Sequence, residues 1–600
     1  MQDNVVAPLI APTTQGNLAQ TVVVNAREVP DKVVFAKRDG AGWLDVTAAE
    51  FASEVDVLAK GLIAAGVGVG DRVALMSRTR YEWTLVDYAI WTAGAVTVPI
   101  YETSSADQVA WITEDSGAVA VVVETGSHAT TVAKVRDRLP SLSDVWQIDS
   151  GALDELGRAG AEVADDDLEQ RRSSTDRTSL ATVIYTSGTT GRPKGCRLTH
   201  GNFKDLAENT AESLGSVVRA PDAATLLFLP LAHVFARFIE VLCVESSARM
   251  GHSSDIKSLL DDFASFKPTF ILAVPRVFEK IYNSSEQKAA SDGKGRVFAM
   301  AADTAIGWSE AQDTGGPGFA LRAKHAVFDR LVYGKLRAAM GGHVRYAVSG
   351  GAPLGTRLGH FYRGIGVIVL EGYGLTETTA PATVNVPDMV KIGTVGTPLP
   401  GVGIRIAEDG EILIKGVNVF VGYHNNDDAS ADAITDGWFR TGDIGELDAD
   451  GYLKITGRKK EILVTAGGKN VAPAVLEDRL RAHPLVSQCI VVGDQKPFIA
   501  ALVTLDPDML PTWAKINGLE GLSPDAARTN EVVLAELQKA VDDANTAVSK
   551  AESIRKFAVL PSDFTEENGY LTPSLKLKRN VVMKDFADDV EALYATAAAR

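Results

Sequence analysis

The chain has 600 residues, of which 46% are hydrophobic and 23% charged, and its net charge is −17. This length exceeds one ordinary domain, and the mix is that of a globular protein. The negative charge speaks against a nucleic-acid partner, because such binding needs clustered positive charge. Cys196, Cys243 and Cys489 lack metal-ligand spacing, so we interpret them as small buried hydrophobes in a reducing cytoplasm.

The chain carries no clear targeting segment. Residues 1–17 lack the basic start of a secretory signal, and apolar stretches such as 88–101 are too short to span a bilayer. We therefore expect a cytoplasmic protein, and the sequence leaves a peripheral membrane contact open. It does not distinguish a monomer from a homodimer.

Helical and strand patterns alternate from the start of the chain. A helix is predicted over 47–65, because Thr47 and Glu50 form a capping box and Gly66 can end it. Short apolar runs bounded by Gly, Pro or charge predict buried strands, and their alternation with helices predicts parallel sheets in an α/β architecture. These runs are 72–76, 95–100, 118–123, 183–186, 225–229, 269–274, 344–348 and 367–370.

Two segments differ in style from the rest. Residues 285–342 are helix-rich and predict a helical insert, with Phe328, Leu331, Val332 and Leu336 on one face. Residues 457–460 form a short charged link, followed by predicted strands at 488–492 and 498–505 and a helix over 531–551. We therefore predict a large N-terminal α/β domain over 1–457 and a small, mobile C-terminal α+β domain over 458–600.

The most informative segment, residues 185–195, follows a predicted strand and reads YTSGTTGRPKG. Its glycines let the backbone approach an anion, its hydroxyls can donate to phosphate oxygens, and Lys194 adds a positive charge. A Walker loop is excluded, because Pro193 replaces its second glycine and Gly195 follows the lysine. The candidate phosphate-binding residues are Thr186, Ser187, Gly188, Thr189, Thr190, Gly191 and Lys194.

This segment resembles the signature of the adenylate-forming superfamily, which includes acyl-CoA synthetases, luciferases and peptide-synthetase adenylation domains. The resemblance extends over residues 30–585. It implies an enzyme that uses ATP and Mg²⁺ to activate a carboxylic acid as an acyl-adenylate.

The segment 371–378, EGYGLTET, resembles the adenine and magnesium motif of that superfamily. An aromatic ring such as Tyr373 can stack on a purine, Thr376 can donate to the α-phosphate, and Glu377 is a hard oxygen ligand for Mg²⁺. The segment 349–353 resembles the loop beside adenine and the acyl pocket. The resemblance assigns nucleotide binding also to Glu371, Gly372, Gly374, Gly351, Ala352 and Pro353, and the acyl side of the site to Gly350.

The resemblance continues toward the C-terminus. It implies that Asp443 accepts the ribose hydroxyls and that Arg458 also contacts the ribose. Lys460 matches the hinge of the small domain, although a solvated pair of Lys459 and Lys460 is the plain alternative. Further along, Gly467 matches the glycine of the thiol-entry tunnel, and Lys469 is a candidate aid to that second orientation.

Lys576 matches the lysine that reaches the carboxylate and the α-phosphate during adenylation. Many relatives carry Gly immediately before this lysine, whereas this chain has Leu575, so Lys578 stays a rival assignment. The resemblance thus names Lys576, Thr376 and Glu377 as the catalytic set.

The segment 229–233 resembles an acyl-gate motif. His233 is its candidate residue, and a core histidine bonded to the backbone is the alternative. Some long-chain enzymes carry a gating Trp four residues later, where this chain has Arg237, so any gate here has a different chemistry.

The segment 275–282 resembles one typical of long-chain acyl-CoA synthetases, which implies a long-chain fatty acid and coenzyme A as substrates. Three alternatives remain. A fatty acyl-AMP ligase would load a carrier protein, a related ligase would activate shorter or aromatic acids, and a lipid- and nucleotide-binding protein would not turn over. The presence of Glu377, Asp443 and Lys576 argues against the last.

Overall fold

Most of the predicted buried strands lie in two sheets of the N-terminal part. The computed structural model describes residues 2–40, 42–186, 192–255, 258–572 and 576–595. Its seven-stranded sheet is parallel at the centre, and a tight antiparallel pair, β8 and β9, joins one side. In spatial order its strands are β19 (Gly422–Tyr423), β9 (Lys194–Thr199), β8 (Leu180–Thr186), β5 (Val96–Ile100), β4 (Arg72–Met76), β6 (Ala120–Val123) and β7 (Asp144–Gln147).

The second sheet has five strands, the first three of them parallel. Because parallel strands end at one edge, the segments that follow β13 and β14 meet there. These segments contain residues 350–353 and 376–378, both predicted nucleotide-binding regions. The strands are β12 (Phe270–Ala273), β13 (Tyr346–Ser349), β14 (Ile368–Leu375), β15 (Ala380–Val384) and β16 (Thr397–Pro398).

Two further sheets complete the N-terminal part. A four-stranded sheet contains β10 (Ala224–Leu227), β11 (Arg249–His252), β2 (Val33–Asp39) and β3 (Gly42–Thr47). A mainly antiparallel sheet contains β1 (Gln2–Val5), β17 (Val402–Ile406), β18 (Glu411–Gly416), β21 (Trp438–Leu447), β20 (Ile434–Thr435) and β22 (Leu453–Arg458). Residues 457–458, predicted as a charged link, therefore belong to the end of a strand.

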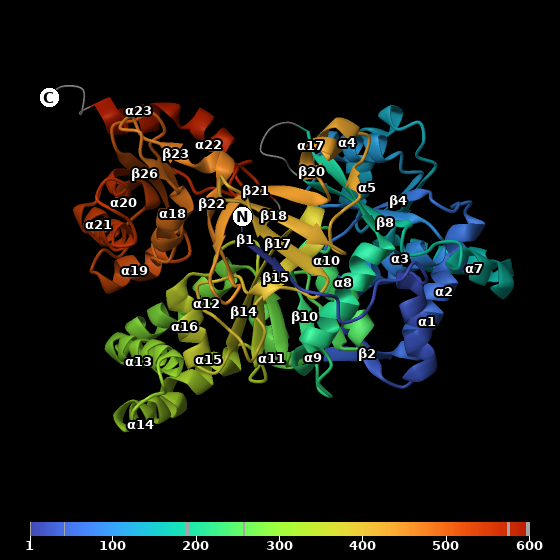
Figure 1. The fold of residues 1–600 in the computed structure, drawn as a ribbon, viewed down its shortest axis with the longest axis horizontal. Helices are drawn as coiled ribbons and strands as arrows, with labels where there is room; N and C mark the ends of the chain where they lie inside the picture. Colours follow the sequence, from blue (N-terminus) through green and yellow to red (C-terminus); the bar gives the residue numbers. More distant parts are fainter. Residues whose placement is uncertain (1, 41, 187–191, 256–257, 573–575, 596–600) are drawn as a thin grey trace.

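Helices α2, α3, α8 and α10 share one hydrophobic core with these sheets. Thr47 and Glu50 form the predicted capping box on α2, and Gly66 follows it with a φ of +90°. Figure 1 shows these helices around the blue and green half of the molecule. The helices here are α1 (Leu18–Glu28), α2 (Ala48–Ala64), α3 (Tyr81–Thr92), α4 (Ala106–Ser116), α5 (Gly126–Ala133), α6 (Ala152–Ala159), α7 (Asp165–Arg172), α8 (His200–Ser213), α9 (Gly215–Val218), α10 (Val234–Ser246), α11 (Leu259–Phe266), α16 (Thr356–Gly364) and α17 (Asp427–Ala433).

The segment predicted as a helical insert is helical and starts earlier, at Pro275. Its apolar stripe differs from the predicted one, because Leu331 is 54% exposed whereas Tyr333 is fully buried. A π-helix over Asp329–Tyr333 causes the difference, since its wider turn shifts the helical phase. The helices are α12 (Pro275–Ser291), α13 (Gly295–Asp313), α14 (Phe319–Phe328) and α15 (Gly334–Ala339).

The C-terminal part has its own cores on the two faces of a small sheet. Cys489 and Val491 face one core and Ile490 and Val492 the other, as the alternation of a strand requires. The predicted helix over 531–551 ends at Asn545, whose side chain bonds the backbone of Ile554. The elements are β23 (Leu463–Val464), β24 (Asn470–Val471), α18 (Pro473–Arg481), β25 (Val486–Val492), β26 (Ile499–Leu505), α19 (Leu510–Ile516), α20 (Pro524–Ala527), α21 (Glu531–Asn545), β27 (Ile554–Val559), α22 (Arg579–Asp585) and α23 (Ala587–Ala595).

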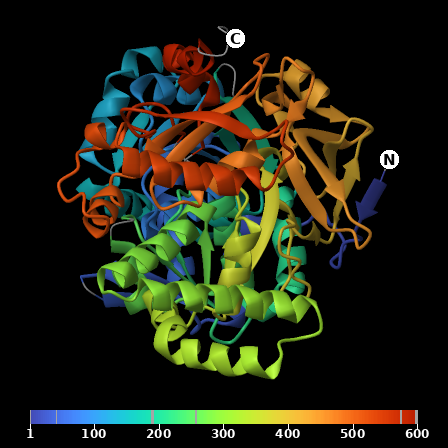
Figure 2. The same cartoon turned by 90° about the vertical axis from the view of Figure 1, so that its left-hand side faces the viewer.

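Figures 1 and 2 show this smaller part packed on one side of the larger one, above helices α12 to α16. All three cysteines are buried and free, as predicted. None of the helices within the described ranges is long and apolar enough to cross a bilayer.

Candidate active site

Asp443 lies at the centre of the predicted nucleotide site. Strand pairing places it opposite Arg458, which donates from Nε to Oδ1 at 3.0 Å. The hydroxyl of Tyr373 donates to Oδ2 at 2.6 Å. Burial, together with the charge of Asp443, raises the pKa of Tyr373 well above its usual value, so this hydroxyl stays a donor. Each carboxylate oxygen keeps a lone pair for a further donor, which suits a diol.

The geometry of Tyr373 depends on the glycine after it. A Cβ on Gly374 would lie 1.7 Å from the carbonyl oxygen of Ala380, and the β14–β15 register shifts at this point. No side chain fits at that distance. Gly374 is therefore needed for the bulge that aims Tyr373, whereas the motif had predicted it as a nucleotide contact.

Glu377 and Thr376 lie in a 3₁₀ turn directly after β14. The hydroxyl of Tyr423 donates to Oε1 of Glu377 at 2.9 Å, and the ammonium of Lys194 lies 4.9 Å from the centroid of the Tyr423 ring. Lys194 in turn faces Thr186 across β8 and β9. These contacts bring the two ends of the phosphate loop beside Glu377. The predicted loop residues Ser187, Gly188, Thr189, Thr190 and Gly191 lie outside the described residues.

Glu377 fits a magnesium site of the kind that substrate phosphates complete. It is half-buried, and among the residues that the structure describes only the Tyr423 hydroxyl donates to its carboxylate. Mg²⁺ commonly takes one or two carboxylates and fills the rest with phosphates and water. The described part of the chain contains no cluster of three His, Cys, Asp or Glu residues suited to a metal.

Glu371 anchors the neighbouring loop. Its buried Oε1 accepts the backbone N–H of Leu354 at 3.0 Å, and burial raises its pKa to about 7. The preceding residues Gly351, Ala352 and Pro353 are exposed, and Gly351 has a φ of +85°. Through this hydrogen bond Glu371 fixes the backbone directly after the 350–353 loop. A Cβ on Gly350 would lie 3.0 Å from the Phe235 ring, so this glycine permits a close approach.

Lys576 lies within electrostatic range of the Asp443, Arg458 and Glu377 side chains. Its backbone N–H donates to the Thr572 hydroxyl at 3.0 Å, and its carbonyl accepts from the Thr572 N–H at 2.8 Å. Surrounding protein lowers the pKa of Lys576, and so does the Arg458 charge, whereas Asp443 and Glu377 act in the opposite direction. Lys576 is nonetheless exposed to solvent. Lys578 instead stands at the start of α22.

His233 caps a helix. Its Nδ1 accepts the backbone N–H of Phe235 at 3.2 Å at the start of α10. Burial and the charge of Lys576 lower its pKa to about 3, so the ring is neutral. The structure thus shows the backbone-bonded histidine of the alternative interpretation, within electrostatic range of Lys576.

Arg237 does not fit the acyl-gate interpretation. It is fully buried, donates from Nε to Asp87 Oδ2 at 2.9 Å, and also bonds Thr182. Its guanidinium lies 5.4 Å and 5.1 Å from the ring centroids of Trp83 and Trp91. A charge in this cage cannot swing into a tunnel, so Arg237 has a structural role.

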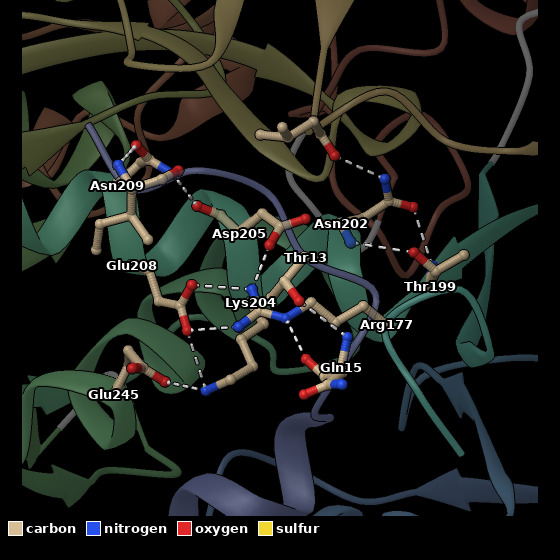
Figure 3. Close-up of polar contacts among 12 residues, drawn as sticks. Thr13, Gln15, Arg177, Thr199, Asn202, Lys204, Asp205, Glu208, Asn209 and Glu245 are labelled. Carbon is tan, nitrogen blue, oxygen red and sulfur yellow. Dashed lines mark hydrogen bonds and ion pairs between the residues drawn. The ribbon is translucent and has the colours of Figure 1, made fainter. Parts of the chain in front are cut away.

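Helix α8 follows the phosphate loop and is fixed by a dense set of polar contacts (Figure 3). Arg177 bonds Glu208 at 2.9 Å and also Asp205, while Lys204 bonds Glu245 at 2.9 Å. Arg177 and Lys204 line a cavity of about 510 Å³. Because both cations are paired, this cluster immobilises the helix and presents no free positive charge to a ligand.

The predicted CoA-side residues lie elsewhere. Gly467 and Lys469 occupy the exposed turn between β23 and β24, where Lys469 pairs with Glu552 at 3.4 Å. Within the described ranges, no hydrogen bond or ion pair joins either residue to the nucleotide side. Lys460 is exposed in the turn that follows β22.

Ion pairs across the interface hold the C-terminal part in this orientation. Arg276 bonds Asp506 at 2.9 Å and Lys280 lies 3.1 Å from Asp508. Gln287 donates to the Met509 carbonyl at 3.3 Å. Helix α12 of the large part therefore binds the segment that precedes α19 in the C-terminal part.

The comparisons with known proteins agree with this geometry. The family model described as AMP-binding enzyme matches residues 22–424, and that of its C-terminal domain matches 460–598. This chain belongs to the AMP-binding enzymes. The family that the motifs predicted is thus confirmed, as is the α/β fold with a large N-terminal and a smaller C-terminal domain.

Named relatives of this AMP-binding enzyme include a long-chain-fatty-acid–CoA ligase. FadD15 of Mycobacterium bovis is 55% identical over 97% of this chain and 98% of its own. Long-chain-fatty-acid–CoA ligase 6 of Mus musculus is 32% identical over 92% of this chain and 82% of its own. The adenylation domain of a carboxylic acid reductase from Segniliparus rugosus, solved with AMP and a co-purified carboxylic acid, superposes with a TM-score of 0.74 at 22% identity. That alignment covers 97% of this chain and 94% of the other.

Sequence reasoning missed several residues in and around the candidate site. Tyr423 stands 46 residues from Glu377, and no spacing rule links an aromatic residue near a turn to a distant carboxylate. The partners Arg276 and Asp506 were also missed, because a single sequence does not reveal contacts between domains.

Proposed function

We propose that this protein is a long-chain fatty acid–CoA ligase that forms an acyl-adenylate from ATP and then transfers the acyl group to coenzyme A. The observation that carries the proposal is the convergence of Lys576, from the C-terminal part, on Asp443, Arg458 and Glu377 of the N-terminal part. Together these side chains offer donors and acceptors for ribose, phosphate and a carboxylate. The likeness to FadD15 supports a long-chain acid.

In the first step a carboxylate oxygen forms a bond to the α-phosphorus, and the bond to pyrophosphate breaks. Asp443 and Arg458 hold the ribose, and Tyr373 lies beside the base. The charge of Lys576 neutralises the phosphoryl oxygens, and the hydroxyl of Thr376 donates a hydrogen bond to them. Catalysis therefore depends on positioning and electrostatic stabilisation. Mg²⁺ bound at Glu377 would neutralise phosphate charge.

In the second step the thiol sulfur of CoA bonds to the acyl carbon, the bond to AMP breaks, and the thiol proton leaves to water. In the observed orientation Gly467 and Lys469 lie in the exposed turn between β23 and β24. We propose that the part after Lys460 rotates about this residue, withdrawing Lys576 and bringing Gly467 to the thiol path.

Product analysis by mass spectrometry tests the proposal. The protein receives ATP, Mg²⁺ and a mixture of acids from acetate to long-chain acids, with and without CoA. Long-chain acyl-CoA that forms only with CoA is the expected result. Acyl-AMP that accumulates and ignores CoA would instead indicate an acyl-AMP ligase, and products of short or aromatic acids alone would overturn the substrate assignment.

The division of labour between the steps is tested with Lys576→Ala. We expect adenylation, measured as pyrophosphate exchange, to fall about 100-fold or more, since the lysine acts on the developing charge. Thioester formation from supplied acyl-AMP should stay within severalfold of wild type. Lys578→Ala is the matched control and should leave both steps nearly unchanged. Equal loss of both steps in the Lys576 variant would contradict the rotation.

A further inference from the structure

Helix α14 exposes an unusual amount of apolar surface. Phe319 is 88% exposed, Val327 55% and Leu331 54%. Single exposed hydrophobic residues are common on proteins. These three share an arrangement, because Phe319, Ala323, Val327 and Leu331 recur every fourth residue and are all exposed. Four-residue spacing aligns Phe319, Ala323 and Val327 as a ridge along α14. Leu331 follows on the π-helical turn Asp329–Tyr333 and is also exposed; we call these four residues the α14 ridge.

Cationic side chains flank the α14 ridge. Between Phe319 and Ala339 the chain carries five Lys or Arg residues and one carboxylate, Asp329, on a protein whose net charge is −17. Asp329 pairs internally with Arg337 at 2.7 Å. Among the described residues, no carboxylate lies within ion-pair distance of Lys324, Arg330 or Lys335, and all three are exposed.

The other face of α14 explains why the ridge is turned outward. His325 stacks on Trp308 with ring centroids 4.1 Å apart and contacts the Gly364 carbonyl at 2.7 Å. Phe328 is buried. These contacts fix the rotation of the helix against the protein. Figures 1 and 2 show α14 at the outer edge of the molecule, beside α13 and away from the C-terminal part.

We propose that the α14 ridge and its flanking cations dock this protein on an anionic lipid bilayer. An apolar helix face bordered by Lys and Arg lies in the interface of a membrane, and anionic lipids attract the cations. Charge complementarity selects this partner, since a strongly acidic protein has here a locally basic apolar edge. A few side chains give weak and reversible attachment, which suits collection of an acid dissolved in the membrane.

Vesicle co-sedimentation of the full-length protein tests the proposal. Vesicles are either pure phosphatidylcholine or phosphatidylcholine with about 30 mol% phosphatidylglycerol. Wild type should bind the anionic vesicles, with a partition coefficient that falls as salt rises. The double variants Phe319→Ser with Val327→Ser, and Lys324→Glu with Arg330→Glu, should each reduce it about tenfold.

Matched controls change exposed residues on other elements. Leu44→Ser with Val532→Ser tests apolar loss, and Lys134→Glu with Lys415→Glu tests charge reversal; both should bind as wild type. Three results would overturn the proposal: no binding to anionic vesicles, equal binding by the ridge variants, or a wild-type dimer in solution that the ridge variants abolish, which would assign the ridge to a second copy. Binding is measured without ATP, so its outcome is separate from that of the ligase assay.

Discussion

Two arginine–aspartate pairs of this protein have the same chemistry and different uses. The Arg237–Asp87 pair has both side chains 0% exposed, whereas in the Arg458–Asp443 pair they are 42% and 11% exposed. The first is closed in by Trp83, Trp91 and Phe203. The second is partly exposed and lies within electrostatic range of Lys576. Access distinguishes a pair that holds the fold from one that is placed to bind a ligand.

Loss of the buried partner should have the largest effect. Arg237→Met leaves Asp87 charged and unpaired, so we expect the free energy of unfolding to fall by about 3–5 kcal/mol. Urea unfolding followed by tryptophan fluorescence measures it. Arg458→Met is the matched control and should cost about 1 kcal/mol or less, because its pair is partly solvated. Equal losses of unfolding free energy in the two variants would contradict the distinction between the two pairs.

The reverse pattern is expected for activity. Asp443→Asn replaces an ionised acceptor of two ribose hydroxyls, so kcat/KM for ATP should fall about 100-fold, as the loss of charged hydrogen bonds implies. Pyrophosphate exchange at varied ATP, with the thermal midpoint as a second readout, measures this. Asp87→Asn should instead lower the thermal midpoint of unfolding. The molecules of this variant that remain folded should have the wild-type KM for ATP. An unchanged KM in the Asp443 variant would refute the ribose assignment.

Glu240 sharpens the comparison through pH. It is fully buried near Asp87, and burial followed by the Asp87 charge raises its pKa well above its usual value. The folded state therefore holds a proton that the unfolded state releases above about pH 4.3, so this group makes stability fall as pH rises from there. Glu240→Gln should flatten that decline, by up to about 1.4 kcal/mol per pH unit, in urea unfolding at several pH values. An unaltered slope would mean that Glu240 is ionised in the fold.

The smallest effect concerns the interface pair. Arg276→Glu or Asp506→Arg should slow adenylation severalfold, because loss of the pair weakens the orientation that places Lys576 near Asp443 and Glu377. The double swap should restore the rate of adenylation. Thioester formation from acyl-AMP should not slow. The more exposed pair Lys280 and Asp508 is the control, since solvated pairs contribute little. Failure of the double swap to recover would indicate that the two side chains do not act as a pair.

Local patterns in the sequence predicted much of the fold. Features that depend on neighbours in the sequence are present in the structure. They are the capping box at Thr47 and Glu50, the strand at 72–76 and the sheet edges that carry the motifs. The misplaced stripe around Leu331 has a different origin. A π-helix is a departure from the regular period, and a pattern method that assumes 3.6 residues per turn cannot anticipate it.

The candidate site divides in the same way. Motifs indicated Asp443, Arg458, Glu377 and Lys576 because residue type and order carry their chemistry. They did not reveal that Gly374 shapes a bulge or that Arg237 is caged, since both depend on atoms that only the folded chain brings near. Resemblance finds positions, and the role at a position depends on what surrounds it.

The position of Arg458 has a consequence for how ligands select the orientation of the two parts. Asp443 and Arg458 both lie on paired strands of the large part. Their contacts with a bound ribose would therefore be the same in every orientation of the C-terminal part. A ligand shifts an equilibrium only by its differential affinity for the two states. The phosphate contacts proposed for Lys576 would therefore be a main source of such a difference. ATP would populate the observed orientation, departure of pyrophosphate would release it, and AMP alone would bias the two populations less.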